Sequence, residues 1–159
     1  VLWVPDWETS TRGSRSTLPE VVPFADAVHN LARAALLVAA LAAGDLGALR
    51  EATTDRLHQD LRLARSPGTR AAIEAALSAG ALAAWLSGSG PSAAAFVEED
   101  RVAAVVAALP EDGRALVLAV DELGATVTGA GNRSEAGSGD RNGVGSGERN
   151  GEEGRHGTS

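Results

Sequence analysis

Ser87-Gly88-Ser89-Gly90-Pro91-Ser92 is the stretch around which the predicted fold is arranged. Apolar runs typical of strands flank it, over residues 80–86 and 93–97. Glycine has no Cβ and accepts positive φ, so this backbone can approach another group closely. Successive N–H groups can then point at the oxygens of a phosphate. The alternative is a plain hairpin connection that needs glycine for its turn.

The loop does not match a known nucleotide-binding fingerprint by itself. It lacks the Lys-Ser/Thr pair of a Walker loop and does not follow the GxGxxG spacing. An apolar strand, rather than a helix, is predicted to follow it. The residues alone leave both interpretations of the loop open.

The composition narrows the class of protein. The chain has 159 residues, 44% of them apolar, which suffices for one domain with a core. The absence of cysteine excludes disulfides, cysteine-based metal sites and thiol nucleophiles. A net charge of −7 without a basic cluster argues against a nucleic-acid partner. No segment is typical of a membrane span or a signal peptide, so we expect a cytoplasmic protein without a membrane partner.

The beginning of the chain suggests that it is part of a longer protein. It contains no methionine, and its first residues, Val1-Leu2-Trp3-Val4, are typical of the middle of a strand. Removal of a leader or of an initiator methionine explains the first feature but not the second. We therefore expect a C-terminal fragment.

Apolar spacing and cap residues predict the order of the elements. The first half holds a strand over residues 1–7 that ends near Pro5, a short helix from 10 or 11 to 16 or 18, a long helix over 24–43 that Gly44 ends, and a helix that Asp45 caps and that runs to about 58. The second half holds a loop over 59–66, a helix over 67–79, strands on both sides of the glycine loop, a helix over 101–109 and a β-rich run over 114–120.

This order fits one helical layer packed on a mainly antiparallel sheet, an α+β sandwich. We expect the folded domain to span residues 1–127. Residues 128–159 contain a repeat with a period of eight residues (137–143 and 145–151) and almost nothing apolar, so they are predicted to form a disordered tail.

Two histidines are candidate metal ligands. His29 and His58 lie on separate predicted helices, each three residues after an aspartate, Asp26 and Asp55. One such pair supplies too few ligands for a metal unless the two helices meet. A surface or hydrogen-bonded core histidine is the favoured interpretation, and we predict no metal site.

Two pairs of arginines are candidate anion ligands. Arg12 and Arg15 are neighbours on one face of the predicted short helix, and Arg62 and Arg65 lie in the predicted loop over 59–66. Loop arginines are usually solvated charges. The functional alternative is a clamp, because a guanidinium binds carboxylate or phosphate through two hydrogen bonds.

Four stretches carry a resemblance to a known family: 4–11 (VPDWETST), 27–36 (AVHNLARAAL), 55–59 (DRLHQ) and 86–92 (LSGSGPS). In this order and at these spacings they resemble the C-terminal half of bacterial homoserine kinases, members of the GHMP kinase superfamily. The glycine motif alone indicates only the superfamily. The resemblance covers residues 1 to about 127 and implies a GHMP-kinase C-terminal domain, a ferredoxin-like sandwich. It also favours the functional interpretation of the glycine loop.

The resemblance implies transfer of the γ-phosphoryl group of ATP to the side-chain hydroxyl of L-homoserine, with Mg²⁺, on the route to threonine. Ser87, Gly88, Ser89 and Gly90 match the superfamily's third motif, which helps to shape the phosphate site. Such a reaction depends mainly on positioning and charge stabilisation, which backbone donors and arginines can supply. A homodimer is left open.

The resemblance also implies roles for single residues. Arg15 and Arg62 match arginines that hold the amino acid in the family, and a guanidinium is suited to its carboxylate. Thr11 matches a threonine near the reacting groups, an accessory role, although an N-cap role explains it equally well. The chain has Asp60-Leu61 where the family usually has Pro-Tyr, which leaves Arg65 as the alternative to Arg62.

The family's nucleotide-binding motif and its Mg²⁺-coordinating acid lie in an N-terminal domain that this chain lacks. We therefore expect the 159-residue chain to be inactive alone. One alternative is another GHMP kinase that acts on a sugar or a mevalonate-type alcohol. Arg15 and Arg62 argue in part against it, because a sugar has no carboxylate to clamp. The other alternative is a non-catalytic α+β module that binds a small anion on the glycine loop.

Overall fold

The computed structural model of the chain describes residues 1–7, 18–121 and 124. They belong almost entirely to one unit, Val1–Val120, and the second unit, Asp121–Ser159, is described only at residues 121 and 124. The expected short helix before residue 18, the expected domain end at 127 and the expected tail over 128–159 lie outside the described residues.

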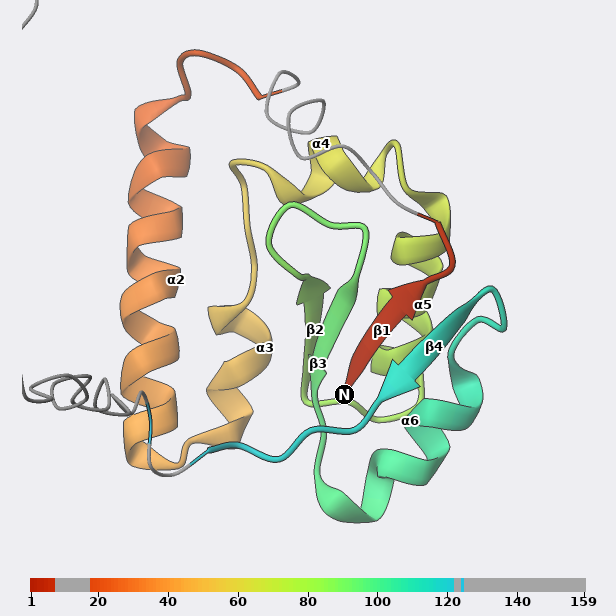
Figure 1. Ribbon diagram of the computed structural model, residues 1–159. Coiled ribbons are helices and arrows are strands. Elements are labelled where there is room, and N and C mark those ends of the chain that lie inside the picture. The colour runs from red at the N-terminus through yellow and green to blue at the C-terminus, as the bar shows by residue number, and fades with distance from the viewer. Residues whose placement is uncertain (8–17, 122–123, 125–159) are drawn as a thin grey trace, which may run out of the picture. The chain divides into compact units, whose positions relative to one another are not determined.

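Four short strands form one antiparallel sheet in the order β2-β3-β1-β4 (Figure 1). Their bounds are β1 Leu2–Pro5, β2 Ala83–Leu86, β3 Ala93–Phe96 and β4 Gly113–Leu116. Pro5 ends β1, as expected for a residue without a backbone N–H. The β-rich run expected to reach residue 120 ends at Leu116, because Leu116 pairs with Leu2 and β1 begins there.

Helices lie on both faces of this sheet. Their bounds, with two 3-10 turns, are α2 Phe24–Ala43, η1 Leu46–Ala48, α3 Leu49–Ala52, α4 Gln59–Leu63, α5 Pro67–Ser78, η2 Glu99–Arg101 and α6 Val102–Ala108. α5 packs on three strands and carries α6 beside it. α3 covers β2 on the opposite face, and α2 packs outside α3 (Figure 1). The expected α+β fold class is confirmed. Besides the one expected helical layer, α3 and α2 form a second group of helices on the other face, next to β2.

The long helix α2 ends where the sequence predicts. Gly44 has a φ of 68°, and its N–H contacts the carbonyl oxygens of Ala40 and Leu41. Asp45 then accepts a hydrogen bond from the backbone N–H of Ala48 at 3.3 Å and so caps η1. The Gly44-Asp45 link returns the chain along α2, which places α3 against it.

The segment after α3 differs from the expectation. The helix predicted to reach residue 58 ends at Ala52, and the predicted loop over 59–66 contains α4. The hydroxyls of Thr53 and Thr54 donate back to the carbonyl oxygens of Arg50 and Glu51, at 3.2 and 2.8 Å. Such local side-chain hydrogen bonds compete with continuation of a helix, and apolar spacing does not report them.

Trp3 is the centre of the larger apolar cluster. Its side chain is 1% exposed, and its Nε1 donates to the carbonyl oxygen of Pro110 at 3.1 Å. The buried residues around it come from α5, α6, the sheet and nearby segments: Leu63, Ala72, Ile73, Ala76, Ala81, Ala84, Leu86, Ala93, Ala95 and Val105.

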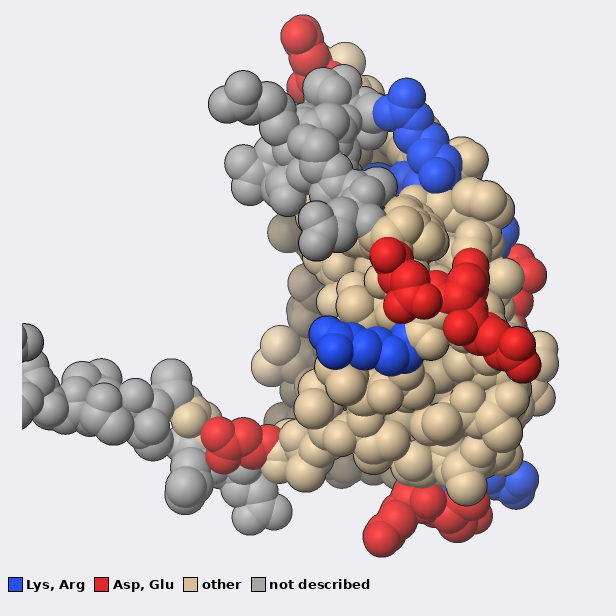
Figure 2. Space-filling view, turned by 45° about the vertical axis from the view of Figure 1, so that its right-hand side comes forward, with Lys and Arg blue, Asp and Glu red and all other residues tan. Residues whose placement is uncertain are grey.

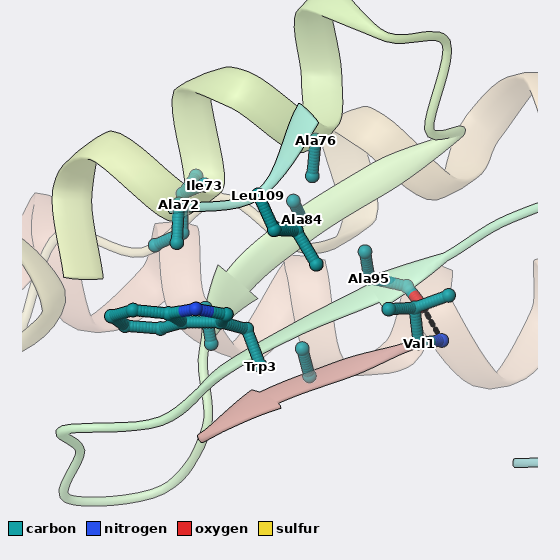
Figure 3. A pocket seen from close by; sticks show the side chains of 10 residues that line it. Val1, Trp3, Ala72, Ile73, Ala76, Ala84, Ala95 and Leu109 are labelled. Atoms are coloured by element: carbon teal, nitrogen blue, oxygen red, sulfur yellow. Dashed lines mark hydrogen bonds between the residues drawn. The ribbon is translucent and has the colours of Figure 1, made fainter. Parts of the chain in front are cut away.

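Figure 3 shows several of these side chains around the space between α5 and the sheet, with the Val1 amino group donating to the Ala95 carbonyl oxygen at 2.9 Å. The space measures about 10 Å³, room for one water at most. It is packed core rather than a ligand site.

A smaller cluster lies on the other face of the sheet. Ala40 of α2, Leu49 of α3 and Ala83 of β2 are buried there. The rings of Trp85 and Phe96 pack beside them, with centroids 4.8 Å apart and planes at 48°. Successive residues of β2 belong to the two clusters in turn, as the pleat of a strand requires.

Helix α2 is relevant to the expectation that no segment is typical of a membrane span. With 20 residues, it is long and apolar enough to be one by length and composition. A single helix of this kind is weak evidence. Its four most polar residues contact the rest of the unit in the pairs Asp26 with Arg56, His29 with Thr54, Asn30 with Asp55 and Arg33 with Glu51. These contacts hold α2 along the side of the unit.

Charged side chains on the face shown in Figure 2 form small groups of either sign, separated by uncharged residues. A nucleic-acid surface needs a continuous run of basic side chains along a phosphate backbone. This face has no such run, and the lack of a nucleic-acid partner stays a prediction.

Substitution of Gly113 by alanine tests the packing around Trp3. A Cβ at Gly113 would lie 2.6 Å from Trp3 Cε2 and 2.8 Å from the carbonyl oxygen of Val4. Neither group has room to move, because Trp3 is buried and Val4 belongs to β1. We predict that Gly113→Ala lowers the free energy of unfolding by about 3 kcal/mol, measured by urea denaturation.

Gly47→Ala is the matched control. The nearest atom to a Cβ there is Asp45 Oδ1, at 3.4 Å, and Gly47 lies in the helical turn η1. Alanine should change the free energy of unfolding by less than about 1 kcal/mol. Equal losses in the two variants would contradict the proposed role of Gly113.

Candidate functional site

The glycine loop connects β2 to β3 as a hairpin. Ser87 N–H donates to the carbonyl oxygen of Ser92 at 2.9 Å, and Gly90 N–H donates to that of Ser87 at 3.0 Å. Gly88 and Gly90 have φ values of 58° and 78°, and the Gly90–Pro91 peptide is cis. The hairpin therefore engages two backbone donors that a phosphate cradle would otherwise use. The loop's own hydrogen bonds fit the hairpin interpretation.

Two side chains of α4 hold this loop from outside. Gln59 Oε1 accepts a hydrogen bond from Leu86 N–H at 2.8 Å, at the end of β2. Arg62 Nη1 donates to the carbonyl oxygen of Gly88 at 2.9 Å, at the tip of the turn. These contacts fix the loop against α4 beyond what a hairpin requires.

A third side chain holds the loop from α5. Thr69 is fully buried, and its hydroxyl donates to the carbonyl oxygen of Pro91 at 2.6 Å. The side following the turn is thus tied to α5, while the side preceding it is tied to α4. The loop lies between two helices whose positions are set by the core.

Asp55 determines where α4 starts. Its Oδ1 accepts hydrogen bonds from the backbone N–H groups of Leu57, His58 and Gln59, at 2.9, 2.7 and 2.8 Å. Its Oδ2 accepts one from Asn30 Nδ2 at 2.6 Å, which connects α4 to α2. Burial alone would raise the pKa of Asp55. Hydrogen bonds from the backbone of Gln59 and His58 and from the Asn30 side chain have the opposite effect, as does the nearby His58 ring. The net result is a pKa below the usual 3.8.

His58 bridges Asp55 and Arg62. Its Nε2 lies 3.3 Å from Asp55 Oδ2, and its Nδ1 lies 3.3 Å from Arg62 Nη1. A guanidinium can only donate, so these partners assign the proton of a neutral ring to Nε2 and leave Nδ1 as the acceptor. Asp55, His58 and Arg62 thus form a continuous chain of contacts that reaches the carbonyl of Gly88.

A polar hollow of about 190 Å³ adjoins this chain of contacts. Since a water occupies about 30 Å³, the hollow has room for a small polar molecule. Its lining residues are Asn30, Arg33, Ala34, Ala52, Thr53, Thr54, Asp55, His58, Gln59, Trp85 and Leu86. Within the described part of the chain, Nε of Arg33, which lines the hollow, and Nε of Arg62, which does not, are buried without a hydrogen-bond partner. Buried donors of this kind are suited to an anionic acceptor.

The structure brings together only some of the predicted site residues. Arg62 contacts the loop of Ser87, Gly88, Ser89 and Gly90, whereas Arg65 is exposed beyond the end of α4. Thr11 and Arg15 lie outside the described residues, and their places stay predictions. Among the residues that the structure describes, no group of three or more His, Asp or Glu could hold a metal ion.

Sequence reasoning missed the roles of Asn30, Asp55 and Gln59. It considers Asp55 as a metal ligand beside His58, and the resemblance of residues 55–59 gives it no role of its own. A stronger signal was available, because an aspartate shortly before a polar helical segment is typical of a helix N-terminus. The resemblance of residues 55–59 marked Gln59 but gave it no role, because its partner is a strand residue 27 positions away.

Comparison with known proteins places these features in a family. Residues 37–115 match the family model for the C-terminal domain of GHMP kinases. A homoserine kinase from Thermus thermophilus is 50% identical over 126 residues, which cover 77% of this chain and 43% of the relative. Homoserine kinase from Desulfitobacterium hafniense is 41% identical over 131 residues, which cover 78% of this chain and 44% of the relative.

A crystal structure of homoserine kinase from Cytophaga hutchinsonii matches with a TM-score of 0.63 at 30% identity, over 67% of this chain and 34% of that chain. The chain thus spans less than half the length of each of these relatives.

Substitution of Gly90 by alanine tests the packing of the loop against Leu86. Alanine there would keep an unfavourable φ of 78° and place its Cβ 2.8 Å from Cδ1 of the buried Leu86. Gly88 has a similar φ of 58°, but no atom lies within 4 Å of a Cβ there. We predict losses of unfolding free energy of about 3 kcal/mol for Gly90→Ala and about 1 kcal/mol for Gly88→Ala, measured by urea denaturation. Equal losses would contradict the contact with Leu86.

Asp55→Asn tests the start of α4 through its pH dependence. The folded state favours the carboxylate, so its stabilisation is fully present above pH 3.8 and is lost as the pH falls through the lower folded pKa. We predict that the variant is less stable than the parent by about 1–2 kcal/mol at pH 7. The difference should shrink when both proteins are unfolded by urea below pH 3.8. Asp60→Asn, at an exposed position of the same helix, is the control. A difference that does not vary with pH would refute the assignment.

Proposed function

This chain belongs to the GHMP kinases as a C-terminal domain of that family, and we propose that it is the C-terminal part of an ATP-dependent homoserine kinase. The proposed reaction phosphorylates the side-chain hydroxyl of L-homoserine to O-phospho-L-homoserine. The observation that carries this proposal is the similarity to relatives named homoserine kinase, at up to 50% identity. This similarity extends over most of this chain, and the family-model match over residues 37–115 includes the glycine loop.

Arg62 is the proposed ligand of the substrate carboxylate. Its Nη1 is occupied by the Gly88 carbonyl and by His58, while its Nε is buried without a partner among the described residues. A carboxylate that accepts from the free side of this guanidinium would therefore lie beside the glycine loop. Arg15 is proposed as the second arginine and Thr11 as an accessory group, on the resemblance alone.

The glycine loop is the proposed contribution of this chain to the ATP site. Since Ser87 N–H and Gly90 N–H are engaged within the hairpin, the loop can line the phosphates but not surround them. The described residues do not fit a Mg²⁺ site, because they include no cluster of three or more acidic or histidine ligands. We therefore assign the Mg²⁺ ligands and most of the phosphate contacts to the part of the kinase that its relatives have and this chain does not match.

Other properties follow from the same proposal. ATP and L-homoserine are the proposed partners, the cytoplasm is the proposed location, and the domain is proposed to end at residue 127 before a tail over 128–159. A homodimer is compatible with the proposal. No membrane or nucleic-acid partner is proposed, since a small-molecule kinase needs neither.

A chimera tests the proposed activity. The part of the Thermus thermophilus homoserine kinase that precedes the matched region would be joined to Val1 of this chain. We expect ATP-dependent phosphorylation of L-homoserine, and little of a sugar or mevalonate, in a coupled ADP-release assay. The 159-residue chain alone should be inactive. A folded chimera that prefers another alcohol, or turnover by the chain alone, would overturn the proposal.

Within the active chimera, Arg62→Ala tests the substrate ligand. Loss of a charge-assisted hydrogen bond costs about 1.5–3 kcal/mol, so KM for homoserine should rise at least about tenfold, with KM for ATP changed less. Arg101→Ala, at an exposed position far along the chain, is the control. If Arg65→Ala raises KM for homoserine instead, Arg65 is the substrate arginine and the assignment to Arg62 fails.

A further inference from the structure

Over its first half, α2 reverses the polarity of an ordinary surface helix, whereas Leu37 and Ala40 nearer its C-terminal end pack in the smaller apolar cluster. The side that faces the rest of the unit carries Asp26, His29, Asn30 and Arg33, each in a polar contact with the segment over 51–56. The opposite side carries only apolar residues at helical spacing, and all of them are exposed: Phe24, Val28, Leu31, Ala35, Val38 and Ala42. We call these six residues the outer face of α2.

The outer face is more apolar and more exposed than the solvent-facing side of a helix in a soluble protein normally is. Phe24, Leu31 and Val38 are 85%, 72% and 70% exposed. A surface helix normally turns its apolar stripe toward the core and its charges toward solvent. With 20 residues, α2 presents this face over about 30 Å, and contiguous apolar surface of that extent marks an interaction site. Figure 1 shows α2 as the outermost element on its side of the unit.

A lipid bilayer is a poor occupant of this face. Spanning the bilayer would detach α2 and leave Asp26, His29, Asn30 and Arg33 in hydrocarbon without their partners. Lying on the membrane surface normally requires flanking lysines or arginines, whereas the chain has a net charge of −7. The face therefore suits an apolar protein surface.

We propose that the outer face of α2 is covered by the preceding part of the same kinase polypeptide. This inference rests on the proposed function. Homoserine kinase relatives are more than twice as long as their match to this chain, so in them a further body of polypeptide is present that can cover this face. Interfaces between domains of one chain bury about 600–1,500 Å², the scale of one long helix face and its surroundings.

Cysteine labelling tests the proposal, because the chain contains no cysteine of its own. Leu31→Cys and Val38→Cys each place one thiol on the outer face, at a position that is already exposed. Ser78→Cys, at the end of α5, is the control. The labelling rate with a maleimide is measured in the 159-residue chain and in the Thermus chimera, after subtraction of the rate of the chimera without an introduced cysteine.

We expect both outer-face thiols to react at least tenfold more slowly in the chimera than in the chain alone, and the thiol at position 78 to react equally in both. Equal rates at positions 31 and 38 would overturn the proposal. Protection in the chain alone that grows with protein concentration would assign the face to a second copy. Protection only with phosphatidylcholine–phosphatidylglycerol vesicles would assign it to lipid, and either result overturns the proposal.

The activity of the chimera separates this inference from the proposed function. An active chimera whose position 31 and 38 thiols react freely contradicts the covered face and leaves the kinase assignment standing. A folded but inactive chimera in which both thiols are protected supports the covered face and contradicts the kinase assignment.

Discussion

The carboxylate of Asp55 is the constraint on which the arrangement of the site depends. Three consecutive backbone N–H groups converge on one of its oxygens, and Asn30 of α2 donates to the other. Because α4 must begin there, Gln59 meets the end of β2 and Arg62 meets the tip of the glycine loop. One short acidic side chain thus relates α2, α4 and the loop, which are far apart in the sequence.

The position of the glycine loop is fixed by contacts with neighbouring helices rather than by hydrogen bonds within the loop. Its own hydrogen bonds form only a hairpin, while Gln59, Arg62 and Thr69 attach it to helices on two sides. Phosphoryl transfer depends on positioning and on charge placed in advance, so a loop held in this way is suited to line one wall of such a site. The remaining walls belong to polypeptide that the relatives possess beyond their match to this chain.

Apolar spacing predicted the fold well where packing decides the structure. The helix over 24–43, the helix that begins at Pro67 and the strands beside the glycine loop follow from it, as does the stop at Gly44. It failed over residues 53–63, where side-chain hydrogen bonds from Thr53 and Thr54 and to Asp55 decide the path. Spacing also predicted the helix over 24–43, but it could not tell that apolar residues such as Leu31 and Val38 point away from the core. Family resemblance, rather than spacing, indicated Arg62 as a substrate ligand. Its hydrogen bond to the carbonyl oxygen of Gly88 became visible only in the structure.

Hydrogen exchange at the Leu86 amide tests the central claim, that Asp55 positions the loop through α4. This amide donates to Gln59 Oε1, whereas the Ala95 amide donates to the carbonyl of Val1 within the sheet. Measured by NMR in the parent and in Asp55→Asn, exchange at Leu86 should become at least tenfold faster while Ala95 stays unchanged. If both amides exchange as in the parent, α4 holds the loop without Asp55, and the account is contradicted.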